Sequence, residues 1–254
     1  DAEPEVVVRL ASEILMKNIL KCKSTLKVPI VAIDIAGAES GHKASSHIAS
    51  FDLAHEYLLN KTVHAGEGFG PESISQALRD LHAERIGHGF HMFNESLLQD
   101  PKSKNDPEYI PRLVKYICDR RICVEVCLTS NLDTMPGLEL KDHTLKKLLA
   151  NDFSISLNTD NRLMSNTTTI HELKIAIDTF DLTPKQLREI VITGLKRSFY
   201  HGTYCERRAY VRSVSKYYDE IAAKYGVVVA PSVGFVPGSM PGSPTPKTTK
   251  KYCT

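Results

Sequence analysis

The sequence predicts an α/β fold, a partial TIM-like (β/α) barrel with about five parallel strands and C-terminal helices. Short apolar runs alternate with segments of helical periodicity, which is typical of a parallel sheet. The run at residues 28–37 is rich in β-branched residues, as expected of a strand buried on both faces. Several runs also end in His, Glu or Asp, and barrels of this kind place their functional residues at the carboxyl ends of the strands.

The elements can be assigned in order along the chain. The first is a helix at residues 5–20, in which Val7, Leu10 and Ile14 follow the helical period. Pro71 marks the start of a later helix, because a proline at the first helical position loses no hydrogen bond. After the first helix we predict strand 28–37, helix 45–59, strand 62–66, helix 71–81, strand 85–88, helix 111–120, strand 122–127, helix 143–150 and strand 153–158.

The rest of the chain is predicted to be helical and then disordered. Helices are expected at residues 167–180 and 203–225, with another between them for which Thr183 is the N-cap. Residues 231–254 are dominated by Pro, Gly, Ser, Thr and Lys, and they carry too little apolar surface to order themselves. We therefore expect a barrel domain over residues 1–230, followed by a disordered tail.

The order of the elements also suggests that a part of the barrel is missing. A helix in a parallel β/α protein is normally the crossover from a preceding strand, yet the helix at residues 5–20 has no strand before it. Five strands are too few to close an eight-stranded barrel. We therefore expect the sequence to be the C-terminal part of a longer barrel.

Composition sets only loose bounds on function. The chain has 254 residues, 42% of them hydrophobic, and a formal net charge of +2, which is ordinary for a globular protein. This small charge gives no electrostatic reason to expect a nucleic-acid or membrane partner. No apolar stretch approaches the roughly 18 residues that a membrane-spanning helix needs.

The six cysteines include no C-x-x-C pair. Cys118, Cys123 and Cys127 are open to two interpretations, a metal cluster or small buried thiols in a helix and a strand. The second interpretation fits a reducing, cytoplasmic compartment.

Four polar residues stand where apolar runs stop. His64 and Glu67 end T-V-H-A-G-E, His88 follows R-I-G, and Asp160 follows F-S-I-S-L-N-T. Two His and one Asp can supply metal ligands, and a Glu beside them can carry a proton.

Each of these residues also has a structural interpretation. The two histidines can be capped core residues, Glu67 can lead the next helix, and Asp160 can be a helix N-cap. Thr129-Ser130-Asn131 either lines the site or caps a loop. The eight other histidines, His143 among them, are expected mostly at the surface.

Five stretches together resemble the adenosine deaminase family of zinc-dependent amidohydrolase barrels. H-A-G-E alone is a weak signal, but these motifs at barrel-strand intervals are specific, and the resemblance covers roughly residues 28–198. The matching stretches are D-I-A-G-A-E (34–39), T-V-H-A-G-E (62–67), E-R-I-G-H-G (84–89), E-V-C-L-T-S-N (125–131) and S-L-N-T-D-N-R-L-M-S (156–165).

The resemblance implies a role for each matched residue. His64 and Asp160 correspond to zinc ligands, and Glu67 to the acid that protonates the purine ring. His88 corresponds to the residue that orients the reacting water and helps to deprotonate it. Gly37 and Asn161 correspond to substrate-binding positions at the purine. Asn161 departs from the commoner Asp, but an amide can donate to a ring nitrogen as well.

The family also has an N-terminal H-x-H pair of zinc ligands, and no H-x-H occurs in this chain. The complete enzyme is expected to deaminate adenosine, a small purine nucleoside, to inosine and ammonia with Zn²⁺ as cofactor. Two alternatives stay open. One is a related deaminase of adenine, AMP or a modified adenine, and the other is a truncated, inactive chain.

Overall fold

Five parallel strands form one sheet, and their order in space is their order in the sequence. Each strand pairs in parallel with the next, for example through Val63 opposite Ile86 and Val124 opposite Ile155. This confirms the predicted partial (β/α) barrel. The strands are β1 (Ala32–Ile35), β2 (Asn60–Ala65), β3 (Arg85–His88), β4 (Cys123–Val126) and β5 (Ser154–Leu157).

The computed structural model describes residues 4–228, which divide after residue 201 into two compact units. The sheet lies in the first unit and helix α10 (Tyr204–Lys224) in the second. The predicted disordered tail at residues 231–254 lies outside the described residues, and the single domain over residues 1–230 stays a prediction. None of the helices within residues 4–228 is long and apolar enough to cross a membrane.

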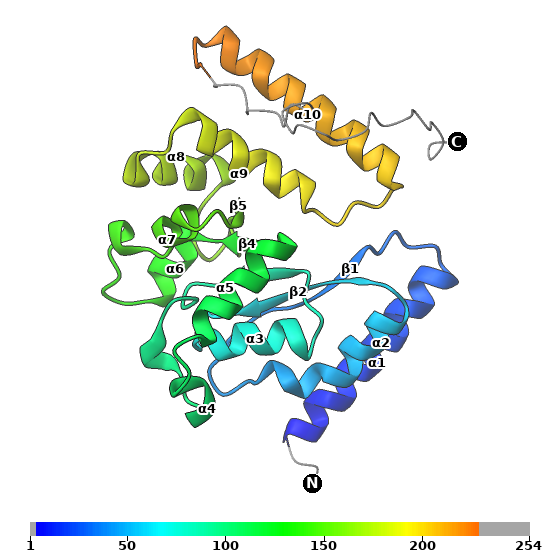
Figure 1. Ribbon diagram of the computed structural model, residues 1–254. Coiled ribbons are helices and arrows are strands. Elements are labelled where there is room, and N and C mark those ends of the chain that lie inside the picture. Colours follow the sequence, from blue (N-terminus) through cyan, green and yellow to red (C-terminus); the bar gives the residue numbers. More distant parts are fainter. Residues whose placement is uncertain (1–3, 229–254) are drawn as a thin grey trace, which may run out of the picture. The chain divides into compact units, whose positions relative to one another are not determined.

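Helices connect the successive strands of the first unit (Figure 1). Thr183 is the N-cap of α9, as predicted, and Gln186 completes a capping box with it. The longer helices of this unit are α1 (Pro4–Ser24), α2 (Ile48–Glu56), α3 (Pro71–Arg79), α5 (Tyr109–Arg120), α8 (Thr169–Phe180) and α9 (Pro184–Lys196). The short ones are η1 (Ala44–His47), η2 (Glu95–Leu97), α4 (Pro101–Lys104), α6 (Leu128–Thr134), η3 (Leu140–Asp142) and α7 (Leu145–Ala150).

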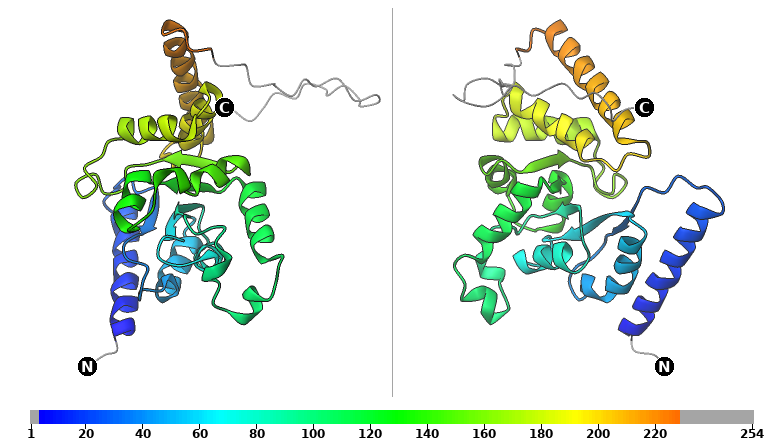
Figure 2. Two further views of the ribbon diagram at one scale, coloured as in Figure 1. Left: turned by 90° about the vertical axis from the view of Figure 1, so that its left-hand side faces the viewer. Right: turned by 45° about the vertical axis from the view of Figure 1, so that its right-hand side comes forward.

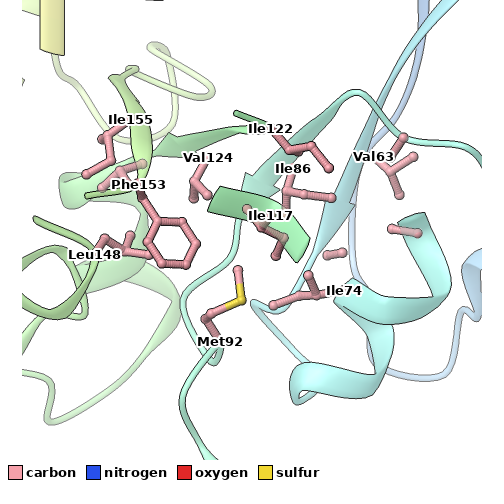
Figure 3. Close-up of a cluster of buried hydrophobic side chains, with 14 of the residues drawn as sticks. Val63, Ile74, Ile86, Met92, Ile117, Ile122, Val124, Leu148, Phe153 and Ile155 are labelled. Atoms are coloured by element: carbon pink, nitrogen blue, oxygen red, sulfur yellow. The ribbon is translucent and has the colours of Figure 1, made fainter. Parts of the chain in front are cut away.

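The main core lies between one face of the sheet and these helices. Val63, Ile86 and Val124 of three neighbouring strands are fully buried and pack with Ile74 of α3 and Ile117 of α5 (Figure 3). Burying an aliphatic side chain of this size contributes roughly 1.5–3 kcal/mol. This layer fixes the register of the strands and therefore the positions of the residues at their ends.

The opposite face of the sheet is polar. Side chains alternate along a strand, so Thr62 and His64 face away from the core that contains Val63 and Ala65. Arg85 lies on this polar face, level with Thr62 in the sheet register. In a barrel this face is the interior, and the carboxyl ends of its strands hold the functional residues.

Within the first unit, a smaller apolar cluster packs α1 against α2. Met16 of α1 packs with Ala54 of α2 and with Leu59, and the hydroxyls of Ser12 and Ser50 hydrogen-bond at 2.7 Å. Helix α1 accordingly runs beside α2 in both Figure 1 and Figure 2.

Two local predictions need correction. The predicted strand at 28–37 is ordered as a strand only over Ala32–Ile35. The predicted helix at 45–59 begins as the 3-10 turn η1 and ends at Glu56, where Tyr57 and the left-handed Leu58 stop it. A further helix, α6, forms directly after β4 where a loop was one of the expectations.

Candidate active site

Four polar residues lie at or just after the carboxyl ends of β2, β3 and β5. His64 lies in β2, Glu67 in the loop that follows, and His88 is the last residue of β3. Asp160 follows the end of β5. His88 and Asp160 have φ of 62° and 53°, a left-handed conformation that few residues other than glycine adopt. Such backbone outliers cluster at functional sites.

The structure brings these four side chains together. Glu67 bridges the two histidines, with Oε2 3.1 Å from His64 Nε2 and Oε1 3.4 Å from His88 Nδ1. The other ring nitrogen of His88 lies 3.7 Å from Asp160 Oδ2. Gly87 pairs with His64 across the strands, and a Cβ there would lie 3.1 Å from the His64 Cα. The missing side chain therefore lets the backbone of β3 lie close to that of His64.

The donor set suits a zinc ion. His64, Glu67 and His88 each offer one ligand atom, and these atoms lie within 4.8 Å of one another. Imidazole nitrogens and carboxylate oxygens are the usual zinc ligands besides cysteine thiolates. Asp160 adds a carboxylate at the edge of this cluster, held by a 2.8 Å hydrogen bond from the Ser130 hydroxyl.

Glu39 is a site residue that the sequence interpretation missed. Its buried carboxylate accepts hydrogen bonds from the backbone N–H groups of Glu67, Gly68 and Phe69 at 2.9–3.1 Å, and Oε1 lies 3.0 Å from His64 Nδ1. A carboxylate behind a ligating histidine fixes the ring and makes it a better ligand. Glu39 thus directs His64 Nε2 toward the cluster.

The charges of the cluster follow from these contacts. Burial alone would lower the pKa of His64, but its hydrogen bonds to Glu39 and Glu67 outweigh burial and raise the pKa to about 9. Burial would raise the pKa of Glu67, yet the hydrogen bond from His64 and the positive charge of that ring contribute to lowering it. The pKa of His88 is lowered by burial and by the charge of His64. The cluster therefore pairs one cationic histidine with carboxylates and keeps the second neutral.

Gly37 and Asn161 occupy different surroundings. Gly37 has φ of 121° and lines a cavity of about 470 Å³ together with His64. Asn161 is exposed, is not among the residues that line this cavity, and accepts a hydrogen bond from the backbone N–H of Met164 at 3.3 Å. The side chain of Asn161 thus belongs to a turn. The N-cap of α8 is Thr168 rather than Asp160.

Asn131 and His143 also belong to the site, against expectation for His143. Asn131 is fully buried in α6 and donates to Glu67 Oε1 at 3.0 Å. His143 was expected at the surface but is only 1% exposed, because it fills the space behind Asn131. The position of Asn131 just after a strand was a usable signal. His143 lies far from any strand end, and its burial depends on how α6 and α7 pack.

Cys118, Cys123 and Cys127 are free thiols, as in the second interpretation, but only Cys123 and Cys127 are buried, and Cys118 is partly exposed. Cys118 lies in α5, Cys123 in β4 and Cys127 just before α6. Burial raises the pKa of Cys123 and of Cys127, which disfavours the thiolate that binds metals.

The curated relatives of the chain are adenosine deaminases. The chain is 37% identical over 187 residues to the adenosine deaminase of Salmonella typhimurium, and 38% identical over 180 residues to that of Salmonella typhi. These alignments cover 74% and 71% of this chain but 51% and 49% of the relatives. The chain therefore spans about half the length of the curated relatives it matches.

Solved structures show the same fold. An adenine deaminase from Arthrobacter aurescens has a TM-score of 0.67 at 21% identity, covering 83% of this chain and 59% of its own. An amidohydrolase from Burkholderia ambifaria with bound zinc has a TM-score of 0.69 at 18% identity, covering 84% of this chain and 55% of its own. Residues 6–216 match the adenosine deaminase family itself. By this match and by its relatives, the chain belongs to the adenosine deaminase family.

Proposed function

We propose that this chain forms part of a zinc-dependent site that hydrolyses the exocyclic amine of adenosine to give inosine and ammonia. The convergence of His64, Glu67, His88 and Asp160 carries the proposal. Family membership narrows the chemistry to adenine-type substrates, and the curated relatives named above are adenosine deaminases. The proposal refers to the full-length protein, because the relatives are about twice as long as the matched region.

The residues of the chain would share the chemistry as follows. His64 Nε2 and the Asp160 carboxylate would hold the zinc ion, with Glu39 orienting the His64 ring. When bound, zinc lowers the pKa of a water from 15.7 to about 7. Glu67 would protonate a nitrogen of the purine ring, which makes the adjacent carbon electrophilic. His88 would hold the attacking water against that carbon.

Glu67 has to be protonated for this role. In the structure its pKa is lowered by the hydrogen bond from His64. A His64 that uses Nε2 to bind a metal cannot donate that hydrogen bond, so this contribution disappears in the loaded site. Burial then favours the neutral acid.

We propose that Gly37, through its backbone N–H, and Asn161, through its amide, bind the purine. The turn bond of Asn161 uses Oδ1, whereas the proposed bond to the purine would be donated by Nδ2.

A phosphorylated substrate such as AMP is the second candidate. The cavity beside His64 is also lined by His42, Lys43 and His47, which are groups that suit a phosphate. Within residues 4–228, no ion pair is formed by Lys43. The N6-mAMP deaminase of Arabidopsis shares the fold at 21% identity with a TM-score of 0.64, over 82% of this chain and 55% of its own.

The test measures zinc content and ammonia release by the full-length protein with adenosine, adenine and AMP. We expect zinc-dependent turnover of adenosine above the other two. The variant Glu67→Gln should keep zinc and lose about 100-fold or more of the turnover, because only the proton donor is removed. The variant His64→Ala should lose zinc and turnover together.

The surface histidine His82, which contacts Asp52 and stacks on His55, provides the control variant His82→Ala. It should change neither zinc content nor turnover. Near-full activity of Glu67→Gln would overturn the assignment of the acid. A zinc-loaded protein that deaminates none of the three substrates would overturn the proposed function, and one that prefers AMP would establish the second candidate. The chain alone, with two family ligand positions, should bind zinc weakly.

A further inference from the structure

We infer that His143 and Asn131 fix the proton of His88 on Nε2, so that His88 meets the attacking water as a hydrogen-bond donor and not as its base. The inference rests on the proposed function for the identity of the water. The tautomer itself rests on the hydrogen bonds of three residues within the chain and on the burial of His143. Asn131 and His143 are positioning residues here, because they act through His88.

The first link is set by the backbone. The N–H of Leu145, at the start of α7, donates to His143 Nδ1 at 3.0 Å. A backbone amide has no alternative tautomer, so Nδ1 has to be an acceptor. Burial lowers the pKa of His143 to about 4, and the ring is therefore neutral near pH 7. A neutral ring with an accepting Nδ1 carries its single proton on Nε2.

The second link orients a side-chain amide. His143 Nε2 lies 3.1 Å from Asn131 Oδ1, so the ring N–H donates to this oxygen. Rotating the amide by 180° would set an N–H group against the N–H of His143. Asn131 is fully buried and has no bulk water to compensate for such a clash. The amide oxygen therefore faces His143, and Nδ2 faces the cluster.

The third link passes this orientation to His88. Asn131 Nδ2 has two hydrogens and two neighbours, Glu67 Oε1 at 3.0 Å and His88 Nδ1 at 3.1 Å. His88 Nδ1 accordingly accepts a hydrogen bond. The competing arrangement, in which His88 Nδ1 donates to Glu67 Oε1 at 3.4 Å, would place two N–H groups face to face at the shorter distance. The proton of neutral His88 is thus on Nε2.

The consequence concerns the space between His88 and Asp160. His88 is 3% exposed, and its Nε2 lies 3.7 Å from Asp160 Oδ2, which is longer than a direct hydrogen bond. A neutral ring whose proton is on Nε2 has no lone pair there, and its one basic nitrogen, Nδ1, faces Asn131, so it cannot take a proton from the water. It donates to the oxygen of the water instead. Asp160, held by Ser130, is the acceptor that remains for the proton of the water.

The direct test reads the tautomers in the chain as it is. Long-range ¹H–¹⁵N correlation spectra of the ¹⁵N-histidine-labelled chain at pH 8 distinguish Nε2–H from Nδ1–H rings. The signals of His88 and His143 are assigned by their loss in His88→Gln and His143→Gln. Both rings should be Nε2–H. An Nδ1–H or doubly protonated His88 would overturn the inference and leave the proposed function standing.

Asn131→Asp is the decisive variant, because it is nearly isosteric and replaces the donor by an acceptor. The tautomer of His88 should change to Nδ1–H. In the full-length protein kcat should fall by about 100-fold, and KM should change by less than about threefold. The reason is that loss of a residue that orients a site residue typically lowers activity by 10–100-fold. His143→Leu should leave His88 as a mixture of tautomers, whereas His143→Gln, which keeps a donor toward Asn131, should retain Nε2–H.

Backbone ¹H–¹⁵N spectra of each variant establish that it is folded. An unchanged His88 tautomer in folded Asn131→Asp would overturn the relay. If Asn131→Asp does not fold, the tautomers of the unsubstituted chain still decide the question. A confirmed tautomer together with a protein that deaminates none of the substrates would reject the proposed function and not the relay.

Discussion

At the scale of single residues, Glu39 decides how well His64 can act as a ligand. Its carboxylate accepts hydrogen bonds from three backbone N–H groups and lies 3.0 Å from Nδ1 of His64. Replacing it in Glu39→Gln removes the charge and one acceptor, so the His64 ring loses its fixed orientation and part of its basicity. We expect zinc affinity to fall by about 10–100-fold. Competitive zinc titration with a chromophoric chelator measures this change.

Glu72 provides the matched control for Glu39. Its carboxylate also accepts backbone hydrogen bonds, from Gln99 and Asp100 at 3.0 and 2.9 Å, but it contacts no histidine of the cluster. Glu72→Gln should therefore lower stability by about 1 kcal/mol without changing zinc affinity. Equal losses of zinc affinity in the two variants would show that Glu39 acts only by holding the loop together.

At the scale of elements, helix α7 is preceded by a histidine, His143, that has to stay neutral. His143 Nδ1 accepts from Leu145 N–H and thereby satisfies one of the unpaired donors at the start of α7. The pKa of His143 is lowered from 6.5 to about 4, chiefly by burial. The unfolded chain therefore binds this proton at a higher pH than the folded chain. Stability is complete above pH 6.5 and is lost as the pH falls toward 4.

The predicted loss approaches roughly 3 kcal/mol at pH 4, since each unit of pKa shift corresponds to 1.36 kcal/mol. Urea denaturation at pH 7.5 and pH 5 measures it. His143→Gln should be less stable at pH 7.5 but should lose less on going to pH 5. His171→Gln, at an exposed position of α8, controls for the removal of a histidine. The same pH slope in His143→Gln and in the unsubstituted chain would contradict the assignment.

The elements also show how far the sequence predicts this molecule. The strands and the residues at their ends were predictable, because an apolar run that stops at a polar residue is a local pattern, as at His64 and His88. Glu39 and His143 were not, because their roles depend on contacts across 25 and 12 residues. A single sequence shows no periodicity for such contacts.

At the scale of the whole sheet, Arg85 connects the polar face across three strands. Its guanidinium donates to Glu125 of β4, to the Ser156 hydroxyl of β5 at 3.2 Å, and to the backbone carbonyl of Arg197, just after α9, at 2.8 Å. Thr62 of β2 donates to the same Glu125 carboxylate at 3.2 Å. These hydrogen bonds tie β2 through β5 and the end of α9 together on the face opposite the apolar core.

This network predicts a strong energetic coupling between Arg85 and Glu125. Arg85→Leu leaves Glu125 unpaired among partly buried neighbours and should cost roughly 2–4 kcal/mol, at the lower side of buried pairs because Glu125 keeps 24% of its side-chain exposure. Glu125→Leu should cost less, since Arg85 retains Ser156 and a carbonyl. The double variant should be more stable than the sum of the two losses implies, by about 1–3 kcal/mol in a double-mutant cycle by urea denaturation. If the losses of stability in the two single variants simply add in the double variant, Arg85 and Glu125 are not coupled. The apolar face alone would then hold the strands in register.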